Sequence, residues 1–320
     1  MRRSVFLLLL LRGFTAAAKA LRPGVEQQTS SQQTSSQQTS SQQTSSQQTS
    51  SQQTSSQQTI SSALKLPLTP NSVRFAIIGD SGTGEHPQHQ VAQQMVTFRK
   101  DFPFDFVLML GDNIYGSKSD EDFKKKFEHP YAALRDGGVK FYASLGNHDH
   151  TSERLYAPFN MNGQRYYTIK NGNVQFFALD SNYMDPEQMQ WLDGQLSGSK
   201  ATWKICFFHH PLYSHGKFHG SDLDLRARLE PMLVKYKVDV VLNGHEHVYE
   251  RVKPQQGIQY FVLGNSGQLR PHNLNPSPDT VKGFDTDHTF GMVEIAGDQF
   301  NFQVVSRTGA TVDSGVVQKR

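Results

Sequence analysis

Short apolar runs that end in polar loops recur along the chain and dominate its predicted secondary structure. Apolar runs of about four to eight residues are typical of buried strands. We therefore expect strands at 73–78, 105–110, 139–143, 203–208 and 238–242. Each run leads into a loop that carries acidic, amide or histidine side chains. Ligand sites in open α/β folds lie at the carboxyl ends of strands, so these segments predict one shared site at a sheet edge.

Other segments show the spacing of helices or the alternation of exposed strands. Apolar residues at helical intervals predict helices at 86–100, 120–127, 131–135, 186–196 and 223–234. Asp185 is suited to cap the fourth of these helices, with Pro186 at its first position. Paired strands are expected at 164–169 and 174–179, with Asn171-Gly172 as a hairpin turn.

Strands dominate the rest of the chain. We expect them at 260–263, 292–295, 300–306 and 311–317, with a long proline-rich loop over residues 264–279. This order is typical of the α/β and α+β classes. The prediction is a four-layer αββα sandwich, in which two mixed sheets pack face to face between helices.

The first 66 residues differ in composition from the rest. Residues 1–20 have a basic start, a short apolar core and a small-residue cleavage site after Ala20, as in a secretory signal peptide; an uncleaved start is the alternative. Residues 27–59 repeat Gln-Gln-Thr-Ser-Ser and lack large apolar side chains, which predicts a disordered spacer over residues 21–66. Residues 67–320 form the predicted domain.

The charge balance argues against a nucleic-acid partner. Six of the 32 Lys and Arg residues and one of the 29 acidic residues precede residue 67, which leaves a slight acidic excess after it. The triple lysine at 124–126 is interpreted as a solvated face. Cys206 is the one cysteine, so no intrachain disulfide can form, and its apolar surroundings indicate a buried side chain. We expect a monomer that is not membrane-bound once the signal peptide is removed.

Oxygen and imidazole donors gather at the strand ends. They are Asp80, Asp112, Tyr115, Asn147, His148, His209, His245 and His247. Such donors suit Fe, Zn or Mn, and the absence of thiolates argues against a structural zinc site. One carboxylate can bridge two ions about 3.5–4 Å apart, the spacing of hydrolytic two-metal sites. The pattern therefore predicts a dinuclear centre.

These motifs resemble those of a known enzyme family. Gly79-Asp80, Gly111-Asp112-Asn113, Gly146-Asn147-His148-Asp149, His209 and Gly244-His245-Glu246-His247 are similar to the motifs of calcineurin-like metallophosphoesterases. Within that superfamily, Tyr115, three residues past Asp112, resembles the phenolate ligand of small, single-domain purple (tartrate-resistant type) acid phosphatases. The resemblance spans roughly residues 73–310.

The resemblance implies two sets of ligands, one for each ion of a metal pair. A ferric ion would be held by Asp80, Asp112, Tyr115 and His247. A divalent Fe, Zn or Mn ion would be held by Asp112, Asn147, His209 and His245, with Asp112 bridging. His209 matches better than His210, because the family's ligand stands two residues before a proline, here Pro211.

The resemblance also implies catalytic residues beside the metals. His148 matches an imidazole that faces the substrate, and Asp149 is a candidate for orienting its ring. His219 resembles a second such imidazole, with His215 as its competitor. No function is assigned to Glu246.

The implied activity is that of a secreted acid phosphatase. It would hydrolyse phosphate monoesters in small phosphorylated substrates by in-line attack of a metal-bound hydroxide. A periplasmic, lysosomal or vacuole-like location also fits a signal peptide. The alternatives are a phosphodiesterase or pyrophosphate-bond hydrolase of the same superfamily, and a non-catalytic binding module that keeps the fold.

Overall fold

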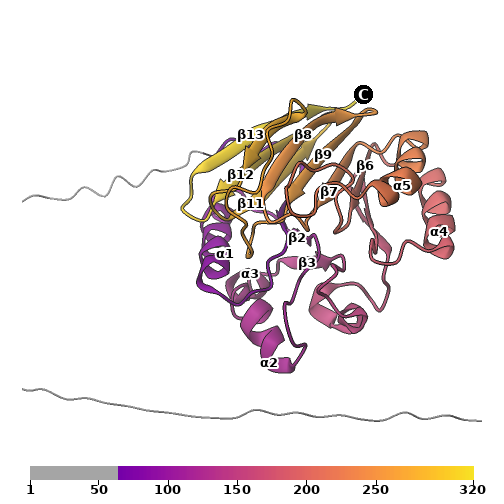
Figure 1. Cartoon of the computed structure of the whole chain (residues 1–320). Helices are drawn as coiled ribbons and strands as arrows, with labels where there is room; N and C mark the ends of the chain where they lie inside the picture. The colour runs from indigo at the N-terminus through magenta and orange to yellow at the C-terminus, as the bar shows by residue number, and fades with distance from the viewer. Residues whose placement is uncertain (1–63) are drawn as a thin grey trace, which may run out of the picture. The chain divides into compact units, whose positions relative to one another are not determined.

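Two β-sheets pack face to face and carry helices on their outer faces (Figure 1). The computed structural model describes residues 64–320. The predicted αββα arrangement of two mixed sheets is confirmed. The predicted signal peptide (1–20) and nearly all of the predicted spacer (21–66) lie outside the described residues.

The first sheet has six strands in the order β13-β12-β11-β1-β2-β3. Strands β1, β2 and β3 run parallel. Strand β11 pairs antiparallel with β1, β12 with β11, and β13 with β12. The bounds are β1 Val73–Ile78, β2 Phe106–Met109, β3 Lys140–Ala143, β11 Thr289–Ala296, β12 Gln299–Ser306 and β13 Thr311–Gln318.

The second sheet has seven strands in the order β10-β8-β9-β7-β6-β5-β4. Its central strands β5, β6, β7 and β9 are parallel, and β4, β8 and β10 are antiparallel to their neighbours. The bounds are β4 Tyr167–Asn171, β5 Val174–Ala178, β6 Trp203–Phe207, β7 Val240–Asn243, β8 Tyr249–Gln255, β9 Ile258–Leu263 and β10 Thr280–Phe284.

Helices connect the parallel strands of both sheets. Their bounds are α1 His86–Arg99, α2 Asp120–Phe123, the π-helical turn η1 Lys124–Glu128, α3 Ala132–Asp136, the 3-10 turns η2 Thr151–Leu155 and η3 Ala157–Phe159, α4 Pro186–Ser197, and α5 Leu223–Lys235. Asp185 caps α4 by accepting a hydrogen bond from the Gln188 amide, which confirms the predicted cap.

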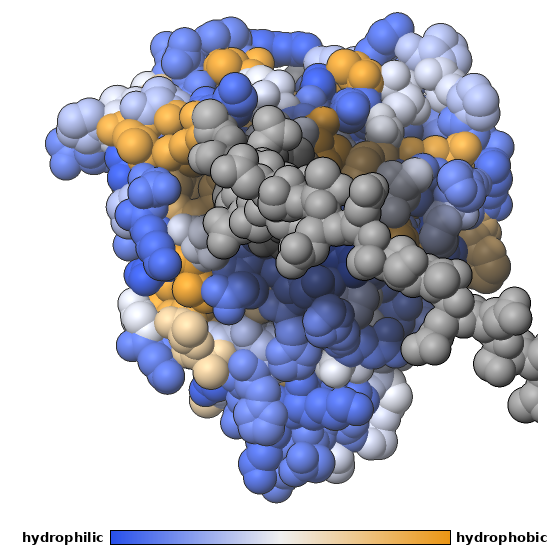
Figure 2. Space-filling model, turned by 90° about the vertical axis from the view of Figure 1, so that its left-hand side faces the viewer, coloured by the Kyte–Doolittle hydropathy of each residue, from blue (hydrophilic) through white to orange (hydrophobic). Residues whose placement is uncertain are grey.

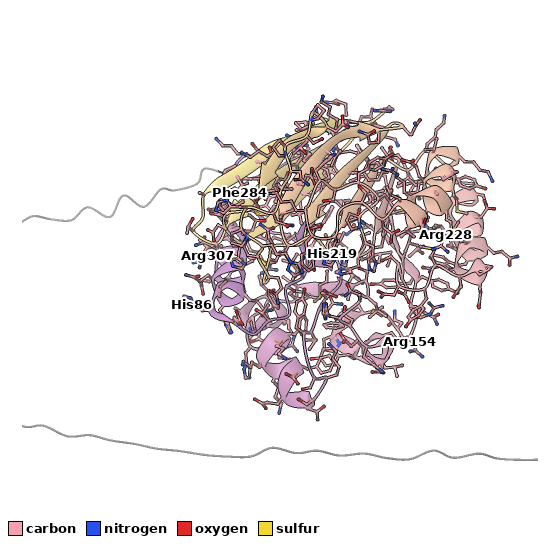
Figure 3. The ribbon with its side chains drawn as sticks, in the orientation of Figure 1. His86, Arg154, His219, Arg228, Phe284 and Arg307 are labelled. Carbon is pink, nitrogen blue, oxygen red and sulfur yellow. The ribbon has the colours of Figure 1, made fainter. Side chains whose placement is uncertain are left out.

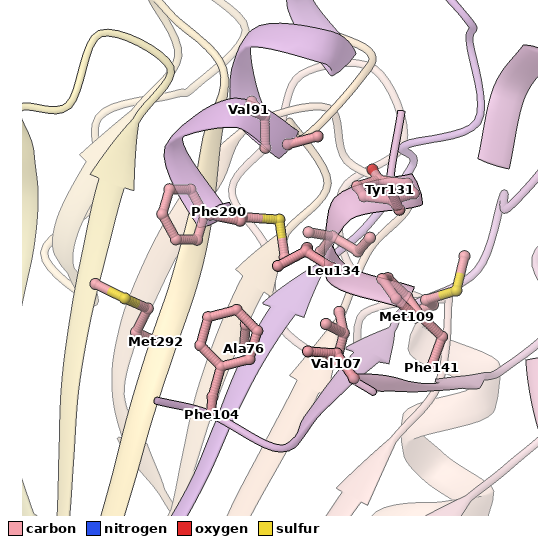
Figure 4. Packing of buried hydrophobic residues seen from close by; sticks show 14 of the residues in the cluster. Ala76, Val91, Phe104, Val107, Met109, Tyr131, Leu134, Phe141, Phe290 and Met292 are labelled. Atoms are coloured by element: carbon pink, nitrogen blue, oxygen red, sulfur yellow. The ribbon is translucent and has the colours of Figure 1, made fainter. Parts of the chain in front are cut away.

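Alternation along the strands divides the core into three layers. In β1, Phe75 and Ile77 face the other sheet, whereas Ala76 and Ile78 face α1. Figure 4 shows the α1 side, where Val91 and other apolar side chains pack against β1 and β2. A third cluster lies between the second sheet and helices α4 and α5. Side chains two residues apart share a face of a strand, so β1 contributes to two of these layers.

Two strands were missed because their sequences do not look like buried strands. β8 contains three charged side chains and Pro254 after Tyr249, and β10 is a short edge strand with a glycine. β8 forms a strand because it pairs with β9. Its register follows from this antiparallel neighbour and not from local propensity.

Two predicted boundaries shift. The hairpin strand β4 begins at Tyr167 and not at residue 164, and its two-residue loop is Gly172-Asn173, since Asn171 pairs with Val174. Packing against the domain also begins before residue 67. Leu66 is buried in the core on the α1 side.

Hydrophilic and hydrophobic residues are mixed on the visible surface (Figure 2). On the visible part of the face in Figure 2, hydrophobic residues form small groups among hydrophilic ones. Among the helices of residues 64–320, none is long and apolar enough to cross a membrane.

Candidate metal centre

The loops after five parallel strands bring the predicted donors to one place. Asp80 follows β1, Asp112 and Tyr115 follow β2, Asn147 follows β3, His209 follows β6, and His245 and His247 follow β7. The carboxyl ends of parallel strands meet at the same edge of a sheet, and the two sheets face each other. The site is therefore built jointly by both sheets.

Four side chains form one half of the site. The Tyr115 hydroxyl donates to Asp80 Oδ1 at 3.2 Å and lies 3.3 Å from His247 Nε2. Asp80 Oδ1 is also 3.3 Å from His247 Nε2. Ligand atoms of Asp80, Asp112 and His247 all lie within 4.8 Å of one another, a separation that one metal ion can span. Asp80 and Asp112 are almost fully buried.

The other half centres on the Nε2 atom of His209. It lies 3.0 Å from Asn147 Oδ1, 3.1 Å from His245 Nδ1 and 3.4 Å from Asp112 Oδ1. The second ring nitrogen, Nδ1, lies 2.9 Å from the Leu110 carbonyl and donates its proton there. A neutral His209 therefore presents a lone pair on Nε2 towards oxygen acceptors, an arrangement that a cation between them would stabilise.

Burial shifts the pKa of the Asp80 carboxyl group and the pKa values of the imidazoles in opposite directions. Burial and the neighbouring Asp112 raise the pKa of Asp80 well above its ordinary value. Burial lowers the pKa of His247 to about 4, and burial with neighbouring imidazoles lowers the pKa values of His209 and His245. Negative charge on Asp80 is thus unfavourable, while the three imidazoles stay neutral and keep the lone pairs that bind metals. The donor set fits a pair of cations.

Strained backbone and close glycines hold these donors. Asp80, Asp112 and His245 have φ values of 51°, 51° and 71°, in the left-handed region that costs a residue with a side chain about 1–3 kcal/mol. A Cβ on Gly146 would lie 2.2 Å from Asp112 Oδ1, and one on Gly244 would lie 2.5 Å from Asp80 Oδ2. Glycine is needed at both positions because the carboxylates lie directly against the backbone.

His148 lies at the outer side of the site. Its ring centroid is 5.0 Å from that of Tyr115, and its backbone amide donates to Asp112 Oδ1 at 2.9 Å. The side chain is exposed, so its imidazole can reach a molecule that enters from solvent.

Asp149 connects two loops of the site. Its two carboxylate oxygens accept hydrogen bonds from the backbone amides of Asn113, Ile114 and Gly146 and from the Asn113 side chain. None of these hydrogen bonds goes to His148, so the orientation of its ring by Asp149 stays a prediction. Asp149 ties the loop after β2 to the loop after β3.

The structure places His219 and His215 in different surroundings. The His219 ring centroid lies 3.9 Å from that of His245, whereas His215 Nδ1 lies 2.7 Å from Glu250 Oε1. Figure 3 labels His219 near the centre of the view, well away from Arg228 of α5. His219, and not His215, therefore borders the site.

His210 turns away from the position that His209 occupies. Its Nδ1 lies 2.8 Å from Ser181 Oγ, although its ring centroid is 4.4 Å from that of His245. It lines a polar groove of about 600 Å³ that also includes Asn147 and Asp222. A groove beside the donors gives a substrate's leaving group a place to bind.

Three further residues support the site and were not predicted. Lys126 donates to the Tyr115 carbonyl, so one lysine of the triple is not a solvated side chain as interpreted. Glu246 accepts hydrogen bonds from the backbone amide of His219 and from Asn273. Arg270 lies in the loop after β9, and its guanidinium group is 4.0 Å from the centre of the Phe218 ring. Arg270 belongs to the proline-rich loop over residues 264–279, and nothing in the sequence singled it out.

Comparisons with known proteins agree with this geometry. The family model for calcineurin-like phosphoesterases matches residues 73–249. Purple acid phosphatase 7 of Arabidopsis thaliana is 27% identical over 289 residues, which cover 78% of this chain and 87% of that protein.

Two solved structures share the fold. GAP50, described as the anchor in the inner membrane complex of Plasmodium, matches with a TM-score of 0.66 and 21% identity over 78% of this chain and 89% of its own. Purple acid phosphatase PPD1 from yellow lupin seeds matches with a TM-score of 0.64 and 19% identity over 77% of this chain and 54% of its own.

Substitution of Gly146 tests whether the donors bind metal. In Gly146→Ala the new Cβ would displace the Asp112 carboxylate, which lies 2.2 Å from its position. We expect the dissociation constant for Zn²⁺ to rise at least about tenfold, as for other changes that misplace a ligand. Metal titration followed by calorimetry measures this change.

Gly194→Ala is the matched control. A Cβ at Gly194, inside α4, meets nothing within 4 Å, so metal affinity should stay at the level of the unsubstituted protein. Equal metal affinities in the two variants would contradict the placement of Asp112 in a metal site.

Proposed function

Because the chain belongs to the calcineurin-like phosphoesterase family, we propose that it is a secreted acid phosphatase of the purple type that hydrolyses phosphate monoesters. The observation that carries this proposal is the convergence of lone-pair donors around His209 Nε2 and Asp80 Oδ1. The similarity to a plant purple acid phosphatase supports the same activity.

The donors divide into two sets that share one carboxylate. We assign Asp80, Asp112, Tyr115 and His247 to a ferric ion, and Asp112, Asn147, His209 and His245 to a divalent Fe, Zn or Mn ion. When bound, the two cations would neutralise phosphate oxygens and activate the water that attacks phosphorus. Burial raises the pKa of Tyr115, so its phenol keeps its proton unless a strongly charged partner displaces it.

The remaining residues act on the substrate. His148 is exposed next to Tyr115, in a position to donate a proton or hydrogen bond to the leaving oxygen. His219 packs against His245 and forms the opposite wall. Asp149 acts indirectly, because it fixes the loop that carries Asn147 and His148.

Location and substrate choice complete the proposal. Secretion, or delivery to a lysosome- or vacuole-like compartment, rests on the basic and apolar pattern of residues 1–20. A phosphodiesterase or pyrophosphate-bond hydrolase would use the same donors. A non-catalytic binding module of this fold is the remaining alternative, and the convergence of the donors argues against it.

Hydrolysis of an aryl phosphate monoester tests the proposed activity. The metal-loaded protein should release phosphate at acidic pH and cleave the monoester faster than the matching diester. Asp112→Ala should reduce activity to background, because it removes the carboxylate assigned to both ions. Asp193→Ala, which changes an exposed carboxylate on α4, should leave the rate unchanged. Equal rates in both variants would exclude a dinuclear mechanism.

The visible spectrum tests the ferric assignment. A phenolate bound to ferric iron produces a charge-transfer band in the family that this sequence resembles, so the iron-loaded protein should be pink to purple. Tyr115→Phe should lose that band, since it removes only the phenol oxygen. An unchanged band in this variant, at unchanged iron content, would show that Tyr115 is not a ligand.

His148→Ala tests the role of the outer imidazole. Loss of a group that protonates the leaving oxygen should lower kcat about 10²- to 10⁴-fold for leaving groups of high pKa, and much less for those of low pKa. Elemental analysis should find an unchanged metal content. A uniform rate for all leaving groups, equal to that of the unsubstituted protein, would refute the role.

A further inference from the structure

We propose that Arg270 is a substrate-binding residue whose guanidinium group binds an oxygen of the phosphoryl group at the metal centre. The proposal rests on the phosphatase function proposed above and adds to it a protein cation that no sequence motif indicates. Arg270 lies outside the ligand sets and outside the residues assigned to proton transfer.

The backbone of Arg270 is fixed to the site. Its amide donates to the carbonyl of His247 at 3.1 Å, so the loop after β9 is held directly against a proposed metal ligand. The side chain is only partly exposed. Any movement of the His247 loop would therefore carry Arg270 with it.

The guanidinium group is held by an aromatic stack. It lies 4.0 Å from the centre of the Phe218 ring, whose centroid is 4.7 Å from that of His219. His219 in turn packs against His245 at 3.9 Å. The series Arg270, Phe218, His219 and His245 thus runs from the loop after β9 to a proposed ligand, and cation–π attraction holds the guanidinium plane in place.

One nitrogen of this guanidinium group lacks a hydrogen-bond partner. Arg270 Nη1 is shielded from solvent, and it has no partner within residues 64–320. A buried charged donor without an acceptor is costly and calls for an explanation. A phosphoryl oxygen would supply the missing acceptor, because the planar guanidinium fork matches phosphate geometry.

The charge of Arg270 lies beside the site. Its backbone contact with the His247 carbonyl and its stacking on Phe218, which contacts His219, place the cation next to both the ligand loop and the outer imidazole. A bound phosphate monoester carries up to two negative charges, and a buried cation beside the donors would offset part of that charge. The geometry and the charge therefore point to the same ligand.

The test measures inorganic phosphate binding to the metal-loaded full chain as well as turnover. Arg270→Met keeps the length of the side chain and removes its charge and donors. It should raise the dissociation constant for phosphate and the KM for an aryl phosphate at least about tenfold, the loss expected for one charge-assisted hydrogen bond. Metal stoichiometry should stay the same.

Two further variants separate binding from structure. Arg270→Lys should recover less than half of the lost affinity in free-energy terms, because Lys has the charge but not the planar fork. Arg226→Met is the matched control, since Arg226 also stacks on an aromatic ring, 4.5 Å from the centre of Tyr213, away from the donors. It should leave phosphate binding and KM unchanged.

The outcomes distinguish the two proposals. Unchanged phosphate affinity and KM in Arg270→Met, with an active parent protein, would overturn the role of Arg270 and leave the phosphatase intact. A parent protein that binds phosphate without hydrolysing any phosphate ester would overturn the proposed function. If Arg270→Met then lost phosphate binding and the control Arg226→Met kept it, the result would still support Arg270 as a phosphate-binding residue.

Discussion

The mutual repulsion of lone pairs is the constraint on which the site depends. His209 Nε2 faces an amide oxygen, a carboxylate oxygen and a second imidazole nitrogen, all within 3.4 Å. The Leu110 carbonyl fixes the His209 proton on the other side of the ring. This arrangement is unfavourable without a cation, and the surrounding fold must hold it in place. Strained residues such as Asp80 and Asp112 show that the fold does so at a local cost.

The sandwich supplies the rigidity that this constraint needs. Strands of both sheets end at the site, and the layer between the sheets is filled by packed aromatic side chains such as Phe75 and Phe176. Close-packed protein interiors resist deformation. The donors can therefore be held close together although they come from loops that are far apart in the sequence, as the path from β1 to β7 shows (Figure 1).

Much of the fold could be predicted from short apolar runs alone, since the parallel strands, β1 among them, are such runs. β8 could not, because its pairing with β9 compensates for charged residues. The donors after each strand were also visible in the sequence. The surroundings of His219, Asp149 and Arg270 were not, because they depend on how distant loops meet: His219 needs the Glu246 carboxylate, and Arg270 needs Phe218. Spacing along a chain carries no signal for such contacts.

Glu246 gives the site one more property. Its buried carboxylate lies between the two histidines of the loop after β7, and it accepts hydrogen bonds from the amides of His219 and Gly220 and from Asn273. A Cβ on Gly216 would collide with it at 2.2 Å. The loop at 216–220 therefore cannot swing open as an independent flap. The loop at 216–220 is fixed to the ligand loop after β7. The same contacts therefore determine both the shape of the entrance to the site and the arrangement of the metal ligands.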